Sequence, residues 1–104
     1  MALEAVNPYR TVLDFSASAA LPPEADAALI NTGGGAVTIT LPTPQPRAGS
    51  VQPGAVRLMK TTGDGNAVTI AAPAGASLVG RSSLTTQWDN VECVPTVDGR
   101  WLVF

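Results

Sequence analysis

The sequence contains no histidine, a single cysteine and few charged residues. Charged residues make up 13% of the 104 positions, about half of the ~25% that is usual for soluble domains. Histidine is the usual triad base and a frequent zinc ligand, so its absence removes most sites of those kinds. The glycine-rich nucleotide loops and the zinc-protease helix motif are also missing. We therefore expect a protein that is not an enzyme and that needs no cofactor or metal.

Long apolar runs are missing as well, because Pro, Glu and Asp interrupt each run before ~18 residues. No segment is therefore expected to span a bilayer. The opening residues MALEAVNPYR have neither the basic nor the apolar part of a signal peptide. The net charge of −2 argues against nucleic acid or an anionic membrane as partner. Cys93 has no partner for a disulfide within the chain, and its strand-like surroundings favour an inert buried thiol.

The chain contains one stretch that occurs twice. Asn31–Pro42 reads NTGGGAVTITLP and Thr61–Pro73 reads TTGDGNAVTIAAP, and each follows a short apolar segment. Both copies have a Thr-Gly turn, then Ala-Val-Thr-Ile, then two residues and a proline. Two copies are too few for a solenoid, which needs at least three repeats to bury a continuous core. The pattern predicts a β-hairpin that is used twice.

Alternating apolar and polar residues, separated by turn signals, predict the strands. Glu24–Ile30 has a composition that favours a helix after two prolines, but only seven residues are available before the first glycine turn. We favour a strand there. The expected strands are Tyr9–Phe15, Ala27–Asn31, Ala36–Leu41, Ala55–Lys60, Asn66–Ala71, Ala76–Val79, Ser83–Gln87, Trp88–Val94 and Arg100–Phe104.

These strands predict an all-β fold, a small antiparallel β-sandwich or jelly-roll-like barrel of eight or nine short strands with a duplicated hairpin. Residues 1–9 are expected to form an extended N-terminal arm and residues 10–104 a single β-domain. The equivalent inward positions of the two repeats should share the core. They are Val37, Ile39, Leu41, Val56, Leu58, Val68 and Ile70.

Few residues suggest a chemical site. Asp64-Gly65-Asn66 is similar to part of a calcium loop, but the spaced carboxylates are missing and a tight turn is favoured. Asp89 and Glu92 are three apart in a strand and would point to opposite faces, so solvated surface charges are favoured over an acid–base pair. Trp88 and Trp101 could stack on a sugar. The more usual role is an aromatic of the core or of a subunit interface.

Three segments together resemble a module of tailed-bacteriophage structural proteins. They are ALINTGGGAVTITLP, GAVRLMKTTGDGNAVTI and SLTTQWDNVECVPTVDGRWLVF, and the match covers roughly residues 26–104. In the module an Asn-Thr-Gly hairpin ends in Leu-Pro, a Lys-x-x-Gly-Asp-Gly-Asn hairpin follows, and an Asp-Gly-x-Trp strand closes the domain. Here the lysine is Lys60, the turn is Gly63–Asn66 and the closing aromatic is Trp101. The proline-rich loop 42–53 looks longer than expected for the module.

The resemblance implies a virion structural protein, and it includes the terminal domains of fibres and spikes as well as small head proteins. Only about 25 residues precede the module in this sequence, with no fibre shaft. We therefore expect a head decoration or cement protein that binds the major capsid protein on the outer capsid surface, as a homotrimer. The alternative is a receptor- or glycan-binding knob that uses Trp88 or Trp101. A secreted inhibitor-like domain is weakened by the missing signal peptide and disulfides.

Two segments could grip the capsid. The arm Met1–Pro8 alternates apolar and polar residues and could add a strand to a partner's sheet. The loop Pro42–Pro53 is stiffened by prolines, which lowers the entropy lost on docking. The expected contact residues are Leu3, Val6 and Arg47, and the alternative is a frayed terminus and an idle surface loop.

Overall fold

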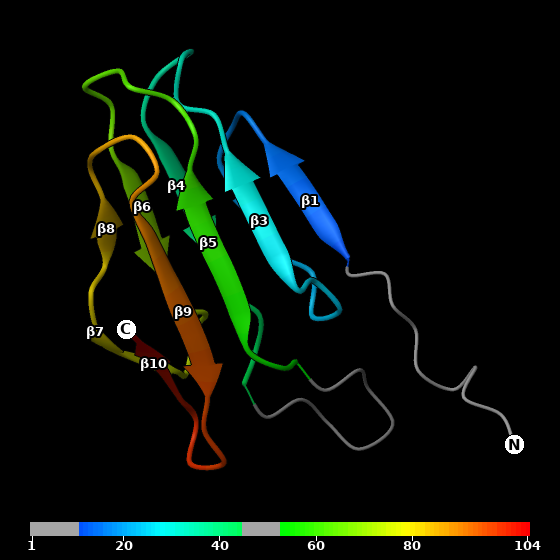
Figure 1. Ribbon diagram of the computed structural model, residues 1–104. Coiled ribbons are helices and arrows are strands. Elements are labelled where there is room, and N and C mark those ends of the chain that lie inside the picture. The colour runs from blue at the N-terminus through cyan, green and yellow to red at the C-terminus, as the bar shows by residue number, and fades with distance from the viewer. Residues whose placement is uncertain (1–10, 45–52) are drawn as a thin grey trace, which may run out of the picture.

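The computed structural model of the protein describes residues 11–44 and 53–104, which form ten strands and contain no helix (Figure 1). In that part of the chain no helix is long and apolar enough to cross a membrane. The strands are β1 (Val12–Phe15), β2 (Ala19–Ala20), β3 (Ala27–Ile30), β4 (Val37–Thr40), β5 (Val56–Lys60), β6 (Val68–Ala71), β7 (Ser77–Gly80), β8 (Ser83–Leu84), β9 (Asn90–Pro95) and β10 (Arg100–Val103).

The expectation of an all-β fold is confirmed, but the expectation of antiparallel sheets is wrong. The strands form a six-stranded sheet in the order β1-β3-β5-β9-β10-β7 and a four-stranded sheet in the order β2-β4-β6-β8. Both sheets are mixed. β1, β3 and β5 pair in parallel, and so do β2, β4 and β6. β9 pairs antiparallel with β5, and β8 pairs antiparallel with β6.

The prediction of a duplicated hairpin is also wrong, because the two strands of each repeat lie in different sheets. β3 pairs with β5, with Ala27 opposite Arg57, and β4 pairs with β6, with Val37 opposite Val68. Each repeat is thus an arch that crosses from one sheet to the other, and the two arches stack with equivalent residues side by side. A hairpin would need its two strands to be neighbours in one sheet, and its favoured turn has only two residues. The connections 31–36 and 61–67 are longer and bridge the two sheets instead.

A third arch precedes the two repeats. β1 pairs with β3 and β2 pairs with β4, both in parallel, so β1 and β2 repeat the same arrangement. We call β1–β2 arch 1, β3–β4 arch 2 and β5–β6 arch 3; Figure 1 shows the three stacked along the molecule. Three units suffice for a continuous stacked core. Arch 1 escapes detection in the sequence because Ser16–Ser18 replaces the glycine turn.

The core lies between the two sheets and is filled from both by alternate residues. All seven residues predicted for it are buried. Trp101 is also fully buried, and its indole Nε1–H donates to the Pro42 carbonyl at 2.8 Å. Cys93 is buried as expected, and this burial raises the pKa of its thiol to about 12. The last two strands, β9 and β10, pair antiparallel and form a terminal hairpin.

Candidate functional site

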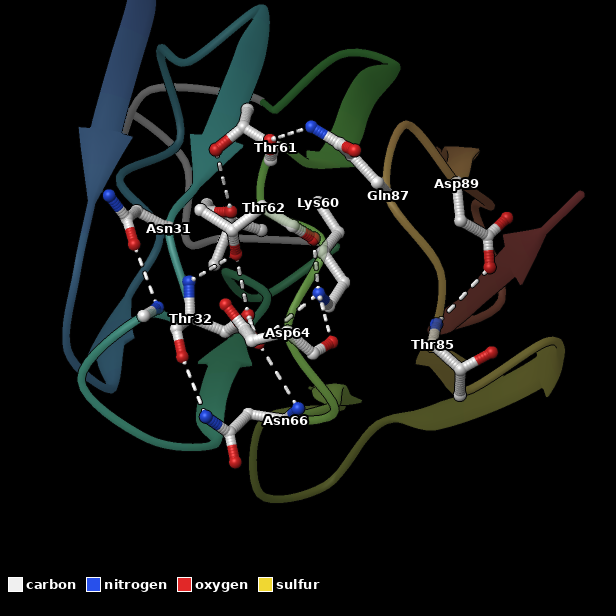
Figure 2. A network of polar contacts seen from close by, with 12 residues as sticks. Asn31, Thr32, Lys60, Thr61, Thr62, Asp64, Asn66, Thr85, Gln87 and Asp89 are labelled. Carbon is white, nitrogen blue, oxygen red and sulfur yellow. Dashed lines mark hydrogen bonds and ion pairs between the residues drawn. The ribbon is translucent and has the colours of Figure 1, made fainter.

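A buried lysine lies at the end of β5 and organises the turn of arch 3 (Figure 2). Lys60 has 0% of its surface exposed, which is rare for lysine unless the ammonium group is paired. Its Nζ donates to the Thr62 carbonyl, to the Asp64 carbonyl at 3.1 Å and to Asp64 Oδ1 at 3.3 Å. The turn therefore folds back over the ammonium group and supplies its acceptors.

The same turn is tied to the turn of arch 2 by side chains (Figure 2). Thr32 Oγ1 donates to Asp64 Oδ1 at 2.6 Å, and the Thr32 N–H donates to Thr62 Oγ1 at 3.1 Å. Asn66 Nδ2 donates back to the Thr32 carbonyl at 2.9 Å. The hydrogen bond from Thr32, with others from Thr62, Asn66 and Lys60, holds the pKa of Asp64 well below its usual range. This Asp64 carboxylate accepts hydrogen bonds within the protein and locks two arches together.

At the opposite end of the stack, no described residue covers arch 1. The Thr11 carbonyl accepts a hydrogen bond from the Ala27 N–H at 3.2 Å, and the Phe15 carbonyl accepts one from the Asn31 N–H at 2.8 Å. Both donors belong to β3 or directly follow it. Peptide groups alternate in direction along a strand, so those of Val12 and Asp14 point away from β3. Within the described ranges, no strand lies beyond β1 or β2 in either sheet. We call this surface, made of β1 and β2, the open end.

Core-facing side chains are incompletely covered at the open end. Leu13 and Phe15 pack against the core but are only partly buried. Their counterparts one arch further in, Ala28 and Ile30, have no exposed surface. The difference arises because nothing among the described residues stacks on arch 1. An edge strand with exposed apolar side chains is a typical surface for strand addition by a partner.

The structure separates the two tryptophans that the sequence suggests as a sugar platform. Trp101 lies in the core, so its ring is not available for stacking. Trp88 lies between β8 and β9 with 59% of its surface exposed. It has a φ of 69°, a left-handed conformation that bulky residues rarely adopt. This strained position, which no sequence signal marks, identifies Trp88 as a candidate binding residue.

The structure also places the remaining charged residues that the sequence singles out. Asp89 forms a bidentate ion pair with Arg81: Nη1 donates to Oδ1 at 3.0 Å and Nη2 donates to Oδ2 at 2.6 Å. The guanidinium lowers the pKa of the Asp89 carboxyl. Glu92 lies on β9 opposite Arg57 of β5. The proposed capsid contacts lie outside the described residues; they are Leu3, Val6 and Arg47.

No protein-family model matches the sequence, and no curated protein matches it.

Proposed function

We propose that this chain is a structural protein of a tailed-bacteriophage virion, a decoration or cement protein that binds the outer surface of the capsid. The observation that carries the proposal is the open end of the arch stack. A protein that attaches to a lattice needs a surface that gains hydrogen bonds and apolar burial on contact, and the open end offers both. The resemblance to phage structural modules names the partner, the major capsid protein.

Strand addition at β1 would extend the six-stranded sheet by one strand. A partner strand would pair with the outward peptide groups of Val12 and Asp14, and it would cover the half-buried Leu13 and Phe15. The arm, residues 1–9, precedes β1 in the sequence, so contacts made by Leu3 and Val6 would add to the same docking event.

The proposal includes a homotrimer. The outward face of the four-stranded sheet carries small uncharged side chains, with Thr38 opposite Thr69 and Thr40 opposite Ala71. Such a face lacks the charges that keep proteins apart and permits close packing of a second copy. Three copies around a capsid three-fold axis would shield these faces and match the lattice symmetry.

We also infer that the two sheets around their shared core are best classed as a small β-sandwich.

The test is binding to capsids that lack the protein. Purified wild-type protein should co-sediment with such capsids to saturation. Deletion of residues 2–7 should reduce the bound amount strongly while leaving the thermal unfolding curve unchanged. Val97→Ser, in the exposed turn between β9 and β10, serves as the control and should bind like wild type.

Absence of binding by wild-type protein would refute the decoration proposal. Full occupancy by the truncated protein would refute the role of the arm and move attention to Arg47 of the proline-rich loop.

A further inference from the structure

Trp88 combines two unfavourable features. Its indole is largely exposed to water, and its backbone has a φ of 69°, where a Cβ atom is disfavoured. A glycine or asparagine would adopt this conformation more easily. Strained backbone of this kind persists where the surrounding structure holds it, and it gathers at binding sites. An exposed tryptophan held in a strained backbone points to a ligand outside the fold.

The backbone of Trp88 is fixed on both sides. Its N–H donates to the Lys60 carbonyl at 2.7 Å, and its carbonyl accepts from Asn90 Nδ2 at 3.0 Å. Asn90 is itself oriented by Arg57, whose Nη1 donates to Asn90 Oδ1 at 2.7 Å. Lys60 belongs to the buried network between arches 2 and 3. The indole is therefore presented from a rigid base, which lowers the entropy lost when a ligand binds.

The residues that directly precede Trp88 in the sequence are polar and neutral. Thr85, Thr86 and Gln87 precede Trp88 and are all exposed. Gln87 is held in place because its Nε2 donates to the Thr61 carbonyl at 3.2 Å. The nearby cation Arg81 is neutralised by Asp89 at 2.6 Å. An exposed aromatic ring that follows exposed hydroxyl and amide residues in one turn suits a sugar, whose C–H face can stack on the ring while its hydroxyls form hydrogen bonds. A protein partner would more commonly meet an anchor ring inside an apolar, water-excluding surround.

We propose that Trp88, together with Thr85, Thr86, Gln87 and Asn90, forms a binding site for a neutral saccharide. The site lies on the turn between β8 and β9, and its occupation does not depend on capsid attachment. A virion protein with such a site would also adhere to polysaccharide.

Fluorescence can isolate the proposed residue, because the other tryptophan, Trp101, is fully buried. Acrylamide should quench Trp88 and leave Trp101 largely protected. The probes are neutral oligosaccharides selected on a glycan array, with cellohexaose, maltohexaose and N-acetylglucosamine hexamer added in solution. At least one should protect Trp88 from quenching in a saturable manner.

Three variants sharpen the test. Trp88→Gly should weaken saccharide binding at least tenfold while the melting temperature stays the same or rises, because glycine accepts the left-handed backbone. Trp88→Phe should keep part of the affinity, because it retains an aromatic face. Phe104→Ser removes another exposed aromatic ring, with 68% of Phe104 exposed, and should bind saccharide like wild type.

The proposal is wrong if no neutral saccharide on the array binds, or if Trp88→Gly binds the selected saccharide as tightly as wild type. It is also wrong if Trp88→Gly lowers co-sedimentation with capsids while no saccharide protects the ring, because Trp88 would then contact protein. Loss of saccharide binding with capsid binding intact supports it.

Discussion

Replacing the buried Lys60 by methionine tests how the turns hold the arches together. Methionine has a similar length and suits an apolar interior, but it cannot donate to the carbonyls of Thr62 and Asp64 or to the Asp64 carboxylate. A hydrogen bond from a charged group contributes about 1.5–3 kcal/mol. Burial of the ammonium group costs several kcal/mol and offsets much of this gain. We expect Lys60→Met to lower the free energy of unfolding by about 2–3 kcal/mol.

Removal of the partner carboxylate should be more damaging than removal of the lysine. Asp64→Ala would leave a fully buried ammonium group with only two carbonyl acceptors and would also remove the acceptor of Thr32. After Lys60→Met, by contrast, the remaining carboxylate has 26% of its side chain exposed and can be hydrated. The expected order of stability is therefore wild type, then Lys60→Met, then Asp64→Ala.

Urea unfolding followed by circular dichroism measures this order. With a slope of about 1–3 kcal/mol per molar urea, the midpoint of Lys60→Met should fall by roughly 1–2 M. Asp98→Ala is the matched control, because its ion pair with Arg100 lies at the surface, and its midpoint should equal that of wild type. A Lys60→Met protein as stable as wild type, or an Asp64→Ala protein more stable than Lys60→Met, would refute the reasoning.

Three further predictions follow from the same structure. Ile39→Ala and Ile70→Ala should each cost about 2–5 kcal/mol and should couple in a double-mutant cycle, because the two residues are register partners on β4 and β6; unchanged melting temperatures would contradict this. The lowered pKa of Asp64 contributes stability that is complete above the unfolded value of about 4 and is lost as pH falls toward the folded value, so acid unfolding should be shallower for Asp64→Asn. Light scattering at micromolar concentration should give a trimer mass, and a monomer mass would exclude an obligate trimer.

Much of the secondary structure and the core could be predicted from the sequence, because alternation reports which face of a strand is inward. Val37 and Ile39 alternate with threonines, and their counterparts in the second repeat alternate with Thr69 and Ala71. Alternation does not report which strand lies alongside. A hairpin and an arch bury the same residues, so the parallel pairing of β4 with β6 depends on the connection between the sheets and could not be read from local pattern.

The candidate site was less predictable. Trp101 and Val103 lie two residues apart on β10 and share its inward face. This spacing is a signal of burial that the sequence does contain. Trp88 follows three polar residues, which is consistent with its exposure. Its left-handed backbone, however, is held by a hydrogen bond to Lys60, which is distant in the sequence, and by one from Asn90, which depends on how that side chain is oriented. Prediction of the open end would require recognising arch 1 in the sequence, and the turn of arch 1, Ser16–Ser18, shares no motif with the repeats.

The most direct test of the account blocks the outer edge of β1. Asp14 directs its peptide N–H away from β3, so Asp14→Pro removes a donor from the outer edge while keeping the pairing of β1 with β3. Asp14→Ala is the control, because it removes the same carboxylate and keeps the N–H. Both variants should fold like wild type by circular dichroism, and their binding to protein-free capsids is measured by co-sedimentation. Docking through the open end predicts that Asp14→Ala binds and that Asp14→Pro does not. Equal binding by the two folded variants would contradict it.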